Sequence, residues 1–164
     1  MTTRSKKIFL AASIIVPFLI YCFYYYGMMV KNAPYKFSEL ESIQFKYGLG
    51  DSLVNQYDSK TAMYQYVTDK DSLVKRKVKL SKNDLLYLHR KAAQLGYWNF
   101  PAEISNTETA PNTPGYFIQF NYKRKSKTVH FALDYNGDPK LKDAVRRLIE
   151  ELSKTINDAE DRYY

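Results

Sequence analysis

The side chains that could perform chemistry are few and widely spaced in this sequence. It contains one cysteine, Cys22, and two histidines, His89 and His130. A catalytic or metal site needs several such groups that converge, and metal ligands recur at characteristic spacings. Neither histidine has a Cys, His or acidic partner at such a spacing. We therefore assign no catalytic, metal-binding or cofactor-binding residue, and interpret both histidines as structural.

Two further patterns fall short of an active-site motif. Gly48 and Gly50 are not followed by G-x-x-x-x-G-K-[ST] or G-x-G-x-x-G, so they do not indicate a phosphate loop. Asp134 and Asp138 are four residues apart and flank a predicted turn. Two acids alone do not define a glycosidase pair, which must flank one scissile bond. Neither pattern assigns an activity.

Positive charge is the most concentrated polar feature. It occurs in two runs, KRKVK at 75–79 and KRKSK at 123–127. If both runs lie in one sheet, they could join into a patch that faces anionic headgroups. A solvated sheet face or a lysine-guarded sheet edge is the structural alternative. The candidate patch residues are Lys75, Arg76, Lys77, Lys79, Lys123, Arg124, Lys125 and Lys127.

The longest uncharged run in the sequence is Ile8 to Val30, between Lys7 and Lys31. A helix of this length spans ~34 Å, enough to cross ~30 Å of hydrocarbon. A cleaved secretory signal usually has an apolar core of only ~7–15 residues and a small-x-small cleavage site, which we do not find here. A buried helix of a soluble protein is the other alternative. We expect a single-pass transmembrane signal anchor with the lipid bilayer as its partner.

The charges that flank this run predict its orientation. Arg4, Lys6 and Lys7 precede it without an acidic residue, and short cytoplasmic segments are enriched in Lys and Arg. We therefore expect the N-terminus in the cytoplasm and the rest of the chain outside the cytoplasmic (inner) membrane. The same three residues account for three of the eight net positive charges. The remainder is only moderately basic, and we expect no nucleic acid partner.

Cys22 lies within this run and has three possible roles. Lipid attachment requires a small residue before the cysteine, whereas Tyr21 occupies that position. A reactive thiol needs a basic neighbour or a helix N-terminus to lower its pKa, and the sequence around Cys22 offers neither. We interpret Cys22 as apolar filler in the spanning helix.

Hydrophobic periodicity predicts the elements of the domain that follows. A helix begins after Ser81 and ends at Gly96, and a second begins with Asp138-Pro139 and extends to Ile156. Between Phe100 and Tyr116, the polar segment 102–115 predicts an exposed loop and the best candidate for recognition. The predicted strands are 43–47, 61–68, 73–80, 116–122 and 127–135.

This order predicts an α+β fold. We expect an N-terminal transmembrane helix and then an antiparallel sheet built of two hairpins, each followed by a helix packed on one face. The predicted regions are a cytoplasmic basic tail (1–7), the anchor (8–30), a juxtamembrane linker (31–42), the extracytoplasmic domain (43–156) and a frayed tail (157–164).

Four stretches of the domain carry a resemblance: IQFKYG, YDSKTAMYQY, KLSKNDLLYLHRKAAQLGYWNFP and KSKTVHFALDYNGDPKLKDAVRRLIEELSK. They resemble those of a family of uncharacterised small α+β domains in bacterial envelope lipoproteins and membrane-anchored proteins. The likeness covers about residues 43–156 and consists of packing motifs, so it implies no catalytic residues.

The sequence leads to a hypothesis about the class of protein. We expect a membrane-anchored extracytoplasmic domain that binds another envelope protein or the membrane-proximal envelope without catalysis. The alternatives are a hydrolase or transferase with an unrecognised site, and an accessory subunit of a membrane complex.

Overall fold

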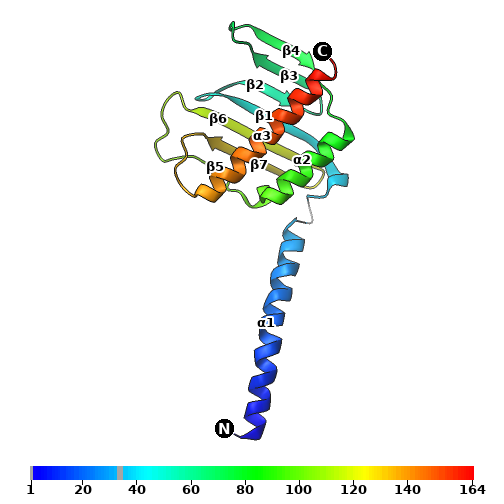
Figure 1. Cartoon of the computed structure of the whole chain (residues 1–164), viewed down its shortest axis with the longest axis vertical. Helices are drawn as coiled ribbons and strands as arrows, with labels where there is room; N and C mark the ends of the chain where they lie inside the picture. The colour runs from blue at the N-terminus through cyan, green and yellow to red at the C-terminus, as the bar shows by residue number, and fades with distance from the viewer. Residues whose placement is uncertain (1, 33–34) are drawn as a thin grey trace. The chain divides into compact units, whose positions relative to one another are not determined.

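The computed structural model describes residues 2–32 and 35–164. The chain separates into two compact units, Met1–Lys36 and Phe37–Tyr164 (Figure 1). The first unit holds the helix α1, Thr3–Asn32, which contains Pro17. Helix α1 is long and apolar enough to cross a membrane, by length and composition. Cys22 lies in this helix as a free thiol.

The second unit is α+β, as predicted, but its sheet is larger than predicted. The described residues form seven strands in the order β4-β3-β2-β1-β6-β7-β5. All neighbouring strands run antiparallel except β5 and β7, which are parallel, so the sheet is mixed and not purely antiparallel. The strands are β1 Leu40–Leu49, β2 Ser52–Asp58, β3 Met63–Val67, β4 Leu73–Lys77, β5 Glu103–Ile104, β6 Pro114–Tyr122 and β7 Ser126–Ala132.

The first strand begins earlier than the sequence predicted. β1 starts at Leu40, within the segment that we assigned to a linker, because Leu40 and Ser42 pair with β6. Ser42 is buried and accepts a hydrogen bond from Asn121 Nδ2 at 2.9 Å. The strand pairing extends the domain toward the N-terminus by at least three residues beyond the predicted start at Ile43.

A tight turn joins β1 to β2, a strand that the sequence analysis did not identify. Gly48 allows this turn, because a Cβ there would lie only 2.1 Å from the carbonyl oxygen of Ser52. Gly50 has a φ of +57°, the left-handed region that glycine adopts easily. These two glycines therefore serve a close backbone approach and not a phosphate loop.

Two helices lie against one face of the sheet (Figure 1). α2, Lys82–Leu95, begins with the predicted capping box, in which Ser81 and Asp84 bond each other's backbone N–H groups. Its C-cap is Gly96, with φ 79°. α3, Pro139–Asp161, begins after the Asp138 cap with Pro139 in its first turn. The two helices also contact each other.

Alternate side chains of the strands point toward these helices and form the core. Ile43 and Phe45 of β1 are buried, and so are Ile118 and Phe120 of β6. From α3, an apolar stripe completes the core with Val145, Leu148, Leu152 and Ile156. The short helices η1, Phe37–Glu39, and η2, Tyr97–Asn99, flank these elements along the chain.

The C-terminal tail was expected to fray, and the structure contradicts this. α3 continues to Asp161, and Arg162 makes a salt bridge to Asp84 at 2.6 Å. The Tyr164 ring lies under the Arg76 guanidinium, 4.7 Å from its central carbon. Charged and aromatic contacts with the rest of the domain therefore hold a segment whose sequence is polar.

Tyr97 joins the aromatic segment after α2 to the sheet. Its hydroxyl lies 2.8 Å from the Ile118 carbonyl oxygen and 3.0 Å from that of Lys127, on neighbouring strands. The ring is fully buried and contacts Trp98, Phe100 and Phe120.

We predict that Tyr97→Phe lowers the free energy of unfolding by about 1–2 kcal/mol, because two buried carbonyls lose a donor. Urea denaturation of the full chain in neutral detergent would measure this. Tyr87→Phe is the matched control, because the Tyr87 hydroxyl bonds Glu151 at the exposed surface, and a change within about 0.5 kcal/mol is expected. Equal effects of the two substitutions would contradict the prediction.

Candidate functional site

The face of the sheet opposite α2 and α3 carries a row of side chains that the core does not require. Strand register places one residue from each strand in this row. At ~4.8 Å per strand the row is ~29 Å long. No helix of the unit 37–164 covers this face. From β4 to β5 the row is Lys75, Gln65, Gln56, Lys46, Phe117, His130 and Glu103.

Near the centre of this open-face row, an aromatic ring lies between a lysine and a histidine. The Lys46 ammonium lies 5.2 Å from the centre of the Phe117 ring, within the range of a cation–π interaction. On the other side, His130 and Phe117 have ring centres 5.0 Å apart at an interplanar angle of 77°. These contacts orient three side chains of different chemical character on one exposed surface.

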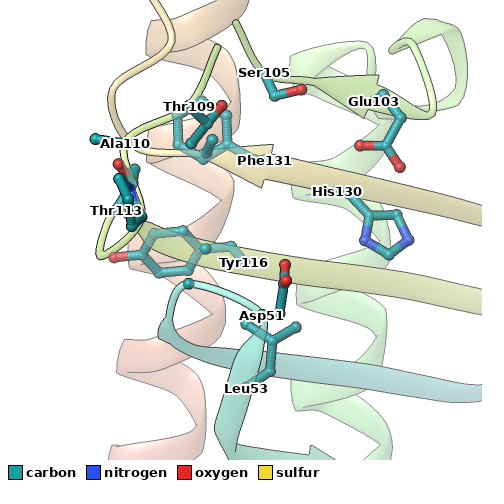
Figure 2. Close-up of a pocket in the computed structure, with 14 residues that line it drawn as sticks. Asp51, Leu53, Glu103, Ser105, Thr109, Ala110, Thr113, Tyr116, His130 and Phe131 are labelled. Carbon is teal, nitrogen blue, oxygen red and sulfur yellow. The ribbon is translucent and has the colours of Figure 1, made fainter. Parts of the chain in front are cut away.

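An open hollow of about 530 Å³ lies at the His130 end of the row. Glu103 and His130 are paired residues of neighbouring strands and lie side by side along one wall (Figure 2). Asp51, from the β1–β2 turn, lies on another side of the hollow. Ser105 and Thr109 add hydroxyl groups. The hollow therefore offers carboxylates, an imidazole and hydroxyls to a polar ligand.

The wall formed by residues 105–113 is the segment that the sequence indicated as a recognition loop. It is tied to the β1–β2 turn by a hydrogen bond of 2.9 Å from Gly50 N to the Thr113 carbonyl. Asn106 bonds the loop after β7 twice, donating to the Asp134 carbonyl at 2.9 Å and accepting from Asn136 N at 3.1 Å. These hydrogen bonds hold this wall of the hollow in place without a bound ligand.

A second hollow of about 310 Å³ lies on the same face over β1 to β4. Four residues of the open-face row line it: Lys46, Gln56, Gln65 and Lys75. Asp58 also lines it and accepts from Gln44 at 3.2 Å. Lys46 thus lines a hollow rich in amide side chains, and its neighbour in the row, Phe117, contacts His130 of the first hollow.

His89 belongs to α2 and does not lie on the open face. It packs among aromatic residues. Its Nδ1 lies 2.8 Å from the Tyr122 hydroxyl, and its ring contacts Phe37 and Trp98. Burial, with the charge of Arg90 as a smaller cause, lowers the pKa of His89 below its ordinary value. This is the environment of a structural histidine.

The two basic runs lie on separate elements of the sheet. β4 carries the first run and the β6–β7 turn carries the second, and four strand spacings separate β4 from β6, ~19 Å at ~4.8 Å each. Arg76 pairs with Glu160 at 2.6 Å, and Arg124 pairs with Glu39 at 2.8 Å. Lys127 donates to the Phe100 carbonyl. The anionic-surface patch stays a prediction.

Of the two histidines that the sequence analysis considered, His130 lies at a hollow with acidic residues and His89 does not. Asp138 is the cap of α3, and Asp134 bonds the 105–113 loop, where its Oδ2 is 3.4 Å from Thr113 Oγ1. Among residues 2–32 and 35–164, no group of three or more His, Cys, Asp or Glu side chains could hold a metal ion. The chain matches no protein family, no curated protein and no solved structure at a significant level.

Sequence reasoning missed the acidic residues that line the hollow together with His130. Glu103 and Asp51 lie far from His130 in the sequence, Glu103 in the predicted loop 102–115 and Asp51 outside every predicted element. The available signal was the alternation of Phe117, Gln119 and Asn121 with buried residues in β6, which marks an exposed face with an unneeded aromatic. This alternation does not specify the strand order, which determines the residues that lie beside one another on the open face.

The lowered pKa of His89 predicts a pH-dependent stability. Because the unfolded chain binds a proton near pH 6.5 and the folded chain binds it only at lower pH, the free energy of unfolding falls as the pH decreases below about 6.5. We predict that His89→Gln reduces the difference in stability between pH 7.5 and pH 5.0.

Urea denaturation at the two pH values would measure it. His130→Gln, which removes an exposed imidazole, serves as the control and keeps the wild-type difference. If His89→Gln also keeps the full difference, His89 does not cause it.

Proposed function

We propose that the protein is a membrane-anchored, extracytoplasmic binding domain that acts without catalysis. The observation that carries the proposal is the open face of the sheet, where Phe117 contacts Lys46 on one side and His130 on the other. Lys46 lines one hollow and His130 lines another. The core packs on the other face, so the fold itself does not need an aromatic residue here. A face that presents an aromatic ring, amides and both signs of charge suits recognition of another molecule.

The anchor is supported by α1. Its apolar side chains are exposed, including Phe9 at 68% and Ile14 at 66%. Such a surface is costly in water and is stabilised in hydrocarbon. The basic residues Arg4, Lys6 and Lys7 before it favour a cytoplasmic N-terminus in the inner membrane. The resemblance to small envelope domains is in keeping with this placement, and an envelope protein is the proposed partner.

A hydrolase or transferase is the second candidate, and one observation favours it. His130 and Glu103 lie side by side at a hollow that also contains Ser105. Binding is preferred because His130 contacts the Phe117 ring and is exposed, whereas a general base needs a nucleophile within hydrogen-bond reach. An accessory role in a membrane complex is a form of the binding function.

We predict that the full chain remains in membranes after alkaline carbonate extraction and keeps its mass of 19.2 kDa. Deleting residues 8–30 should release it, because the hydrophobic span is lost. Protease added to spheroplasts should digest residues 35–164, with a cytoplasmic protein as the protected control. A mature chain that lacks α1 would identify a cleaved signal, and full protection would overturn the orientation.

The open-face proposal predicts face-specific crosslinking. A photoreactive residue placed at Gln119 or Thr128, on the open face, should crosslink one discrete partner in native membranes. The same residue at Lys154, exposed on α3, should not. Adding Phe117→Ala should reduce the crosslink at least about fivefold, because an interface aromatic commonly contributes more than about 1 kcal/mol.

Two outcomes would overturn this proposal. Equal labelling from the open face and from α3 would show that the face has no special role. Turnover of a substrate that is lost in Ser105→Ala and His130→Ala together would establish the hydrolase or transferase in place of the binding function.

A further inference from the structure

Strand β4 forms one edge of the sheet and presents an unpaired backbone. It pairs with β3 on one side, and in the part of the chain that the structure describes no strand pairs with its other side. Figure 1 shows β4 at the opposite end of the sheet from β5. An exposed edge of this kind can accept a further strand through main-chain hydrogen bonds.

The hydrogen bonds around β4 determine which of its residues face outward. Thr68 N bonds the Ser72 carbonyl at 2.9 Å, and Val78 N bonds the Ala62 carbonyl at 2.7 Å. Because bonded pairs alternate along an antiparallel ladder, Val74 and Arg76 bond β3 between these two points. The N–H and C=O groups of Leu73, Lys75 and Lys77 therefore point away from the sheet.

The side chains of Leu73, Lys75 and Lys77 are also accessible to a partner. Arg76 faces the helices, where it pairs with Glu160 of α3. By alternation Leu73, Lys75 and Lys77 lie on the open face, and all three are exposed. Leu73 is 54% exposed and pairs with Val67, which is 37% exposed. The edge thus offers two ammonium groups beside a small apolar patch.

The charges of the edge favour one kind of occupant. A second copy paired antiparallel through β4 would bring lysines within ~5 Å of lysines, which is destabilising. Lysines on an edge commonly prevent such self-association. A strand with carboxylates opposite Lys75 and Lys77 would instead gain cross-strand ion pairs. The acids near this edge, Asp69 and Asp71, lie in the turn beyond Leu73.

We propose that β4 is a docking edge for an extended acidic segment of a partner protein. The segment adds antiparallel to β4 with carboxylates opposite Lys77 and Lys75 and an apolar side chain opposite Leu73. This proposal rests on the binding function proposed above and adds the backbone of the β4 edge to it. The edge adjoins the open-face row at Lys75 and lies at the end of the sheet distant from the His130 hollow.

The test uses the full chain in neutral detergent and a labelled, end-capped heptapeptide, TETETLT. Its alternate residues place two glutamates and a leucine opposite Lys77, Lys75 and Leu73. Fluorescence anisotropy should show saturable binding, at least about tenfold tighter than binding of the control peptide TKTKTLT. Lys75→Glu combined with Lys77→Glu should weaken it about tenfold, whereas Lys140→Glu with Lys154→Glu on α3 should not.

Backbone pairing is tested separately from charge. Methylating the amide nitrogens of the glutamates and the leucine should abolish binding, because these N–H groups face β4, and methylating the threonines should not. Lys75→Pro should also abolish it while leaving the β3–β4 ladder intact. The methylated peptides need no protein variant, so the result does not depend on whether a variant folds.

Three results would overturn the proposal. They are equal binding of both peptides, no effect of methylation, and a concentration-dependent dimer that Lys75→Pro dissociates, which would assign the edge to a second copy. Phe117→Ala should leave peptide binding unchanged. Loss of open-face crosslinks with intact peptide binding would refute only the open-face site, and the converse would refute only the β4 edge.

Discussion

The pairing of β1 with β6 is the interaction on which the rest of the domain depends. It joins Leu40–Leu49 to Pro114–Tyr122 along almost the full length of both strands. On one side of the sheet it brings Ile43 beside Phe120 in the core, and on the other it brings Lys46 beside Phe117. Without this ladder the strands β4 to β1 and the strands β6, β7 and β5 would be two separate sheets. The hollows on the open face then would not share one surface.

Local features of the fold could be predicted because their causes lie within a few residues. The Ser81–Asp84 capping box and the Asp138-Pro139 start of α3 depend only on neighbours in the sequence. Alternation likewise predicted most strands. β2 was missed because Asn55, Gln56 and Asp58 weaken its apolar pattern, although Tyr57 is buried and donates to the Val78 carbonyl at 3.1 Å. The start of β1 was missed because Ser42 is polar and pairs with Asn121, a residue distant in the sequence.

The candidate site depends on strand order, which a single sequence does not specify. His130 was interpreted as structural because no acid lies at ligand spacing, yet β5 brings Glu103 beside it through a parallel pairing of two residues. The two basic runs are the opposite case, because residues that the sequence grouped together lie on separate elements. They are similar in sequence, but β3, β2 and β1 lie between β4 and β6, so the two runs lie apart on the sheet.

The long separation between β1 and β6 has a consequence for how the domain is made. The strands β1 to β4 are complete once Lys77 has been synthesised, but the apolar side of this meander includes Phe45 and Tyr57, whose covering elements come later in the chain. Closing the loop between β1 and β6 is entropically costly, and such non-local contacts slow folding. A chain interrupted before α3 exposes a flat apolar sheet and is prone to aggregate. Productive folding of this domain is therefore coupled to completion of its last helix.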